Sequence, residues 1–308
     1  MGAPLAEAAA LEATYKVREV EGIVDLVFYR RVGFHLARFF ARLNFSPTAV
    51  TLVGGIFGIV AGHFYVYRTL ALNLAGMCLH VVANIFDNAD GQLARLTKQQ
   101  SRTGRILDPV IDHLIWLSIY VHLVLRLRAE GFSNLVWLLG LVAGISHGLQ
   151  AGAADYWRNA YLYFGKGRAE LDSVSTLREE YARYTWRENA WPKFLLRLYL
   201  NAMLEQEVLL LGVKRLREMI VQNFDGRGSV AFQTRYSALA LPTFKWWSLL
   251  MTNTRMLVLF VLFLIDQPIW FFWFEIVIGN LLLLYLVLRQ QRISDSLVQF
   301  LTMQKSST

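Results

Sequence analysis

Four aspartates mark the stretch of this sequence that is best equipped for chemistry: Asp87, Asp90, Asp108 and Asp112. The first two are three residues apart and the last two are four apart, so each pair lies on one face of a helix. Long hydrophobic runs flank the stretch, and carboxylates at the ends of membrane helices are costly unless they serve a function. If residues 96–105 fold the second helix back against the first, the carboxylates converge and need cations to offset their repulsion. Hard divalent ions that prefer oxygen ligands, Mg²⁺ or Mn²⁺, are the expected occupants.

The residues between the two pairs suit a phosphate-bearing ligand. Gly91 and Ala94 lie on the carboxylate side and leave room for a ligand to approach the backbone. Arg95 offers a planar fork of donors that matches a pyrophosphate. Gly104 is expected to turn the chain between the two helices.

The complete spacing, Asp-x2-Asp-Gly-x2-Ala-Arg-x8-Gly-x3-Asp-x3-Asp, resembles the signature of the CDP-alcohol phosphotransferase family. Members of that family are six-helix membrane enzymes, usually dimers, that join a CDP-activated alcohol to a second alcohol and release CMP. The resemblance covers residues 47–112. It implies an all-α integral membrane protein, a homodimer, and a phospholipid-forming reaction between a CDP-activated alcohol, CDP-diacylglycerol in the leading hypothesis, and an alcohol acceptor.

The resemblance also implies roles for the signature residues. Asp87, Asp90 and Asp108 would hold two divalent ions, Mg²⁺ or Mn²⁺, and Asp112 would complete the metal site and act as general base. Gly91, Ala94 and Arg95 would contact the CDP moiety.

A second family pattern, Pro-Asn-x-x-Thr, precedes the first span near the cytidine. Pro47 and Thr51 match it, and Thr48 stands where the family has Asn. Thr51 is therefore a candidate nucleotide-binding residue.

Two residues are candidates for contact with the acceptor. His113 follows the fourth aspartate, where relatives with phosphorylated acceptors often have Lys or Arg. Arg158, at the inner end of the fourth span, resembles an arginine that binds acceptor phosphate in such relatives. The alternative for Arg158 is a charge that anchors the helix among lipid phosphates.

Composition indicates a membrane protein. Hydrophobic residues make up 55% of the 308 residues, nine of them Trp, and the mean hydropathy is +0.37. Apolar runs of spanning length, about 20 residues, predict six transmembrane helices near 48–67, 70–86, 106–127, 134–157, 246–265 and 268–288. In the first of these, Gly54, Gly58 and Gly62 form one stripe of small residues that predicts close helix contact.

Charge predicts the orientation. Only three of the 31 Lys and Arg residues fall in the predicted outer segments, namely Arg68, Arg126 and Arg128. The positive-inside rule then places the aspartate loop at the cytoplasmic interface and both termini in the cytoplasm. The net charge of +8 is explained by an anionic membrane surface, so no nucleic-acid partner is expected.

The lone cysteine, Cys78, excludes an intramolecular disulfide, and the polar N-terminal residues indicate no cleaved signal peptide.

The predicted organisation has three parts. Residues 1–47 form N-terminal juxtamembrane amphipathic helices, which either lie on the membrane or pack on the catalytic body. Residues 48–165 and 245–291 form the six-helix catalytic domain. Residues 166–244 form a helical cytoplasmic or interfacial insertion between the fourth and fifth spans, in which 193–224 is expected to be one long amphipathic helix.

Two polar residues in the second span, His80 and Asn84, share the face of Asp87. They either line the substrate cavity or bond to neighbouring helices, and the second interpretation is favoured.

Three other functions compete with transfer from CDP-diacylglycerol. A CDP-polar alcohol could instead be transferred to a lipid hydroxyl. A cation-coupled transporter could use the acids as an ion site, although they lie at the interface and the Gly-Ala-Arg context would be unexplained. A silent scaffold is disfavoured because all four aspartates are intact.

Overall fold

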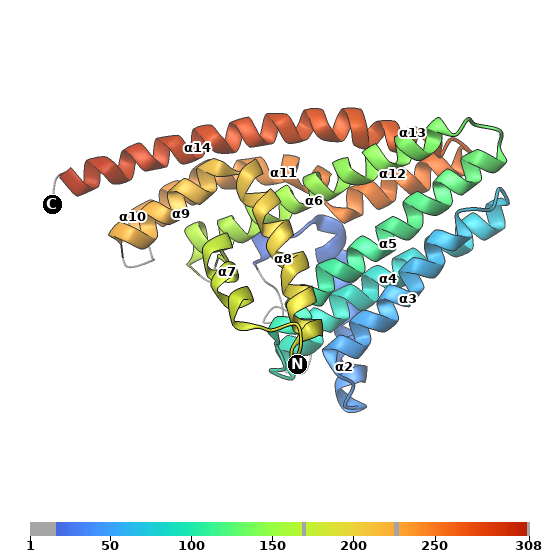
Figure 1. Ribbon diagram of the computed structural model, residues 1–308, viewed down its shortest axis with the longest axis horizontal. Coiled ribbons are helices and arrows are strands. Elements are labelled where there is room, and N and C mark those ends of the chain that lie inside the picture. The colour runs from blue at the N-terminus through green and yellow to red at the C-terminus, as the bar shows by residue number, and fades with distance from the viewer. Residues whose placement is uncertain (1–16, 168–170, 225–227, 307–308) are drawn as a thin grey trace, which may run out of the picture. The chain divides into compact units, whose positions relative to one another are not determined.

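The computed structural model describes residues 17–167, 171–224 and 228–306, and in these the fold is all-helical, without a strand (Figure 1). Six helical stretches are long and apolar enough to cross a membrane: Pro47–Phe64, Leu70–Leu96, Arg102–Ala129, Leu135–Lys166, Val230–Leu264 and Ile269–Met303. The predicted all-α fold with six spans is confirmed. The polar stretch expected at the very N-terminus lies outside the described residues.

The helices belong to two compact units. The first comprises residues 1–144 and 256–273, and the second comprises residues 145–255 and 274–308. The first unit contains α2 (Arg30–Arg42), α3 (Pro47–Phe64), α4 (Leu70–Leu96), α5 (Arg102–Ala129) and α13 (Ile269–Trp273), after η1 (Arg18–Val20) and η2 (Asp25–Tyr29). Two helices, α6 (Leu135–Lys166) and α12 (Thr252–Leu264), contribute residues to both units.

Local signals explain where the helices of the first unit begin and end. Ser46 caps α3 by accepting a hydrogen bond from the Ala49 amide, and Pro47 occupies the first helical turn. The turn between α4 and α5 is made at Lys98, whose φ of 56° is left-handed. Gly104, predicted to make this turn, lies instead inside α5, because Ser101 caps that helix and starts it at Arg102.

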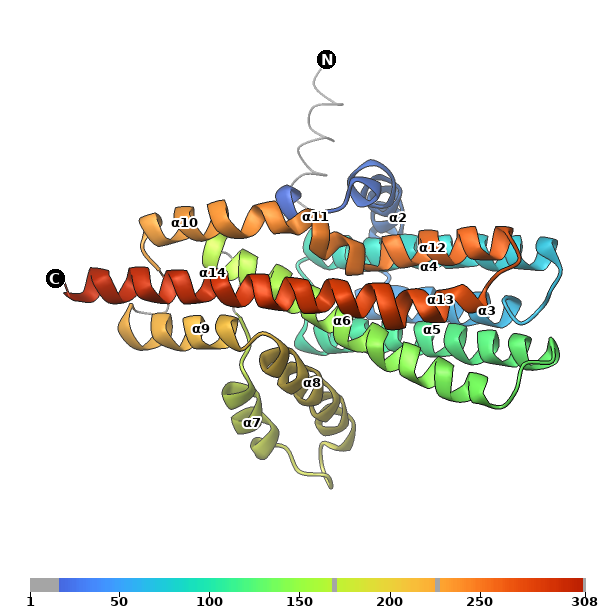
Figure 2. The same cartoon turned by 90° about the horizontal axis from the view of Figure 1, so that it is seen from above.

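Small residues allow α3 to lie close to both α4 and α5, and Figure 2 shows it between them. A Cβ on Gly54 would lie 2.7 Å from the Phe86 Cβ on α4. A Cβ on Gly62 would lie 2.9 Å from the Ile119 amide nitrogen on α5. The predicted glycine stripe is thus the place where α3 makes its closest contacts.

Helix α2 packs on α4 through one face. Ala37 is fully buried in a cluster with Ala89 and Leu93 of α4. The opposite face exposes Arg38 and Phe39, among others. Helix α2 is therefore amphipathic, and its packing on α4 corresponds to the second of the two alternatives given for the N-terminal helices.

The loops at the end of the first unit remote from the aspartates are tied together by ion pairs. Arg126 of α5 is completely buried and contacts Asp266 (2.5 Å) and Glu130 (3.0 Å). Its guanidinium also donates to the Tyr67 carbonyl. These partners come from the α3–α4, α5–α6 and α12–α13 connections, which are the three segments predicted to lie on the outer side.

The second unit contains the region predicted as an insertion. The elements that lie wholly within this unit are α7 (Val174–Arg183), α8 (Ala190–Leu209), α9 (Leu211–Asn223), α10 (Val230–Ala240), η3 (Leu241–Thr243), α11 (Phe244–Trp247), η4 (Ser248–Leu250), η5 (Phe274–Gly279) and α14 (Asn280–Ser306). The prediction of a single helix over residues 193–224 is wrong. The helix is interrupted at Leu210, whose backbone is not helical (φ −117°, ψ 53°). The break lets α8 pair with α7 while α9 lies along α14, where Gly212 approaches Ser294 closely.

Candidate active site

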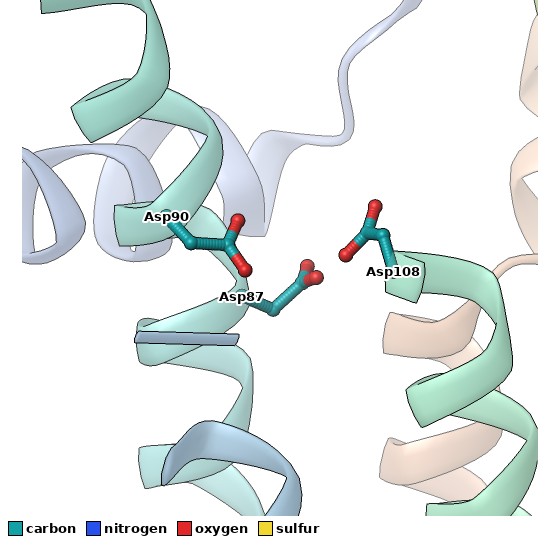
Figure 3. A group of neighbouring side chains, drawn as sticks. All are labelled: Asp87, Asp90 and Asp108. Atoms are coloured by element: carbon teal, nitrogen blue, oxygen red, sulfur yellow. The ribbon is translucent and has the colours of Figure 1, made fainter. Parts of the chain in front are cut away.

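Three aspartates from two helices converge in the first unit. Asp87 and Asp90 project from α4 and Asp108 projects from α5, and their carboxylates point toward one another (Figure 3). One oxygen from each residue lies within 4.8 Å of the others. Asp90 is the most buried of the three, with 7% of its surface exposed. Carboxylates held this close in a protected position repel one another strongly unless cations are bound between them.

The donor set fits hard divalent ions. Mg²⁺ binds oxygen at 2.0–2.1 Å, so two ligands on opposite sides of one ion are about 4.2 Å apart. The three oxygens lie within 4.8 Å of one another, which is close to this separation. The cluster could therefore hold a metal ion, and carboxylate oxygens favour Mg²⁺ or Mn²⁺ over softer ions.

Asp112 occupies a different position from the other three. It lines the same cleft as the cluster, yet it is outside the trio whose oxygens converge and its side chain is exposed. A carboxylate at the mouth of the site is accessible to a substrate hydroxyl.

Thr51 contacts an aspartate rather than facing open space. Its hydroxyl oxygen lies 2.5 Å from the Asp90 Oδ2 and 3.1 Å from the Pro47 carbonyl. A hydroxyl has one proton to donate, and the shorter distance is to the carboxylate. Thr51, a candidate nucleotide contact in the sequence, is therefore placed to orient Asp90.

Arg95 lies in the last turn of α4, beside the cluster. Its terminal nitrogens pass 3.4 Å and 3.6 Å from the position that a Cβ on Gly91 would occupy, so the glycine leaves space for the guanidinium. The Nε of Arg95 is buried without a hydrogen-bond partner among the described residues. A charged donor without a partner is costly, and an anionic group of a ligand would satisfy it. Ala94, the other small residue of the signature, is half-buried at this end of α4.

The cleft around the aspartates has two kinds of wall. One part consists of Thr51 and the four aspartates. The rest is apolar and small, formed by Gly54, Gly55, Ala83, Ile111 and Ile115. The carboxylates therefore lie next to tightly packed apolar residues, since a Cβ on Gly55 would lie 2.6 Å from the Ile111 side chain.

The two candidate acceptor residues are placed differently. His113 is exposed next to Asp112, and its Nδ1 lies 2.5 Å from the Pro109 carbonyl, to which it donates. Arg158 belongs to the second unit, where its guanidinium contacts Asp155 at 2.5 Å. The aspartate cluster and Arg158 are therefore parts of separate compact units.

His80 and Asn84 bond to neighbouring helices. His80 is buried among the rings of Tyr65, Trp116 and Phe260. The Asn84 amide lies 2.9 Å from the Met256 sulfur. Neither residue lines the cleft, so the favoured interpretation of this pair agrees with the structure.

Comparison with known proteins identifies the region that carries the site. Residues 44–160 match the family model described as CDP-alcohol phosphatidyltransferase. This region is similar to CDP-alcohol phosphatidyltransferase domains. It contains both aspartate pairs, Thr51, Arg95, His113 and Arg158, whereas residues 17–43 and 161–306 lie outside the match.

Similar proteins match only in part. A Mycobacterium tuberculosis protein named "Putative cardiolipin synthase" is 34% identical over 61 residues, which are 20% of this chain and 29% of the relative. The Thermococcus kodakarensis "Bifunctional IPC transferase and DIPP synthase" is 25% identical over 144 residues, which are 46% of this chain and 32% of the relative. The chain thus spans about a third of the length of these relatives.

Proposed function

We propose that this protein is a metal-dependent CDP-alcohol phosphotransferase of phospholipid biosynthesis. In the proposed reaction a phosphatidyl group passes from CDP-diacylglycerol to a polar alcohol, and CMP is released. The observation that carries the proposal is the convergence of Asp87, Asp90 and Asp108 within 4.8 Å, in a domain that matches this family.

The charge of the site and one of the similar proteins support a donor that is itself a lipid. CDP-diacylglycerol has a charged diphosphate next to a glycerol backbone with acyl chains. Its diphosphate suits the converging aspartates when cations are bound. The relative named "Putative cardiolipin synthase" supports transfer chemistry on lipids.

Each residue of the site has a defined part in the proposed reaction. Bound divalent ions would neutralise the diphosphate and stabilise the charge that develops on it. The three converging aspartates would hold those ions, with Thr51 orienting Asp90. Gly91 leaves space for the Arg95 guanidinium, Ala94 would leave space for the nucleotide, and the Nε of Arg95 would donate to a phosphate oxygen.

Asp112 would serve as the general base. The acceptor hydroxyl attacks the phosphorus distal to cytidine, its proton passes to Asp112, and the bond from that phosphorus to the bridging oxygen breaks. The bridging oxygen leaves with CMP. An exposed carboxylate at the cleft mouth is accessible to an acceptor that arrives from water, which supports this assignment.

The proposal is tested with purified full-length protein in lipid nanodiscs. Labelled CDP-diacylglycerol is supplied with Mg²⁺ or Mn²⁺ and a panel of polar alcohols, and CMP and labelled lipid are measured. We expect both products to form together and only when a metal and one class of alcohol are present. Consumption of a CDP-polar alcohol together with diacylglycerol would reverse the proposed direction. Cation flux across vesicles without any CMP release would reject the enzyme and favour the transporter.

A further inference from the structure

The α7–α8 hairpin of the second unit, outside the family match, has a well-packed base. Glu207 of α8 accepts a hydrogen bond from the Val174 amide at the start of α7, and Ser173 caps the same helix. Leu177 and Leu195 are buried, with at most 2% of their surface exposed. These contacts fix the two helices against each other, so the connection between them is held as a defined tip.

That tip exposes large aromatic side chains. Trp186 is 54% exposed, Trp191 61% and Phe194 43%, and the last two stack at 5.9 Å between ring centroids. Single exposed hydrophobic residues are ordinary in proteins. Three aromatic residues within nine positions instead form an exposed apolar patch, which is typical of a surface that binds a protein or a membrane. Figure 2 shows the hairpin projecting away from α9 and α14 of the same unit.

The same tip is basic. Residues 181–197 contain four cations, Arg183, Arg187, Lys193 and Arg197, against the single acid Glu188, a net charge of +3. Lys193 donates to the Tyr184 carbonyl and lies over the ring of Tyr181. The three arginines are exposed, so most of the positive charge faces outward beside the aromatic patch.

We propose that this tip docks on an anionic lipid surface. Tryptophan rings settle at the level of lipid headgroups, and neighbouring arginines are attracted to anionic lipids. The chain itself keeps such a surface nearby, because the hairpin starts only seven residues, 167–173, after the end of the candidate span in α6. A protein partner would also use Trp and Arg, but a bilayer is always present at high local concentration beside a membrane-spanning chain.

The test places a fluorescent probe next to the tryptophans. The sole cysteine is removed by Cys78→Ala, and Ala190→Cys, an exposed position beside Trp191, is labelled with the polarity-sensitive dye NBD in the full-length protein. Nanodiscs contain phosphatidylcholine alone or mixed with phosphatidylglycerol. The control carries the dye at Val221→Cys, an exposed position on α9 without an aromatic patch.

We expect blue-shifted emission at position 190 and iodide quenching that is several-fold weaker than at position 221, with a larger difference when phosphatidylglycerol is present. Replacing Arg183 and Arg187 with Gln should reduce the response to phosphatidylglycerol, and Glu188→Gln should increase it. Replacing both Trp186 and Trp191 with Ser should restore quenching. Equal quenching at positions 190 and 221 in both lipid mixtures would overturn the proposal. So would protection that is lost when each nanodisc holds one copy of the chain, since the partner would then be a second copy.

Discussion

At the scale of single residues, the four signature aspartates fall into two kinds. Three converge around a common point, while Asp112 lines the mouth of the cleft and is exposed. A ligand of the ions and a proton acceptor have different requirements, because the first needs enclosure and the second needs access to the substrate. The same residue type can therefore serve both roles within one site.

We predict that Asp112→Asn lowers the rate of CMP release by about 10²–10⁴-fold, the usual contribution of a general base. The amide cannot accept the proton, yet the three converging carboxylates are unchanged. Binding of Mn²⁺, followed by electron paramagnetic resonance, should therefore be largely retained. The matched variant Asp87→Asn should lose both metal binding and activity. Loss of Mn²⁺ binding in Asp112→Asn equal to that in Asp87→Asn would contradict a separate role for Asp112.

A second prediction concerns Thr51. Thr51→Val keeps the shape of the side chain but removes the hydroxyl that lies 2.5 Å from Asp90, so a protected carboxylate loses a partner. The loss of one hydrogen bond to a charged group is worth about 1.5–3 kcal/mol, and we expect roughly tenfold or greater weakening of metal-dependent activity. Thr51→Ser retains the donor and should stay near the parent. A titration of activity against Mg²⁺ measures the effect, and a normal curve for the valine variant would show that the contact does not position Asp90.

The sequence was sufficient to find these residues but not all of their contacts. The spacing of the aspartates predicts their shared helix faces, because that depends only on helix geometry. The contact of Thr51 with Asp90 joins positions 39 residues apart, and no local pattern encodes it. Likewise, nothing local indicates that Arg158 contacts Asp155 in a different compact unit from the aspartate cluster.

At the scale of helices, apolar length predicted the six spans more reliably than it predicted their ends. The apolar part of the second span was expected to end near residue 86, whereas the helix was expected to continue to the connection at residues 96–105, and α4 does continue to Leu96. Hydropathy falls where charged residues begin, whereas a helix ends where its last carbonyls find other partners. For α4 that happens at Lys98, where the Gln99 amide bonds to the Ala94 carbonyl.

Glycine contacts give a prediction at this scale. A Cβ on Gly62 would lie 2.5 Å from the Ser118 hydroxyl oxygen and 2.9 Å from a backbone nitrogen of α5, so Gly62→Ala must push the two helices apart. We expect a lower melting temperature in detergent, from about 1–3 kcal/mol of overpacking. Gly144→Ala is the control, because its Cβ would meet nothing closer than 3.9 Å and alanine favours the helix. Equal melting temperatures for the two variants would show that α3 and α5 can separate at little cost.

At the scale of the whole molecule, the loop contacts agree with the charge pattern. The three connections predicted to lie outside are joined through Arg126, Asp266 and Glu130, so they share one end of the first unit. Of the three basic residues assigned to that side, Arg126 is buried in this network. Arg68 reaches Glu130 from an exposed position, and Arg128 donates to the Phe132 carbonyl.

The orientation itself is a prediction that labelling can check. In the Cys78→Ala background, Asn134→Cys lies in the α5–α6 loop and Gln100→Cys in the α4–α5 loop, and both positions are exposed. We expect a membrane-impermeant maleimide to label position 134 on intact cells and position 100 only after permeabilisation, since the basic side should face the cytoplasm. Labelling of position 100 on intact cells would place the aspartates on the outer face.

The mixed lining of the aspartate cleft also bears on how the two products of the proposed reaction leave the site. In the proposed reaction one substrate yields two fragments with opposite solubilities, a nucleotide that belongs in water and a lipid that belongs among acyl chains. A site with carboxylates beside small apolar residues would hold the reacting phosphorus where these two media meet. The nucleotide would then leave toward water and the lipid toward the acyl chains, so the two products would depart in different directions.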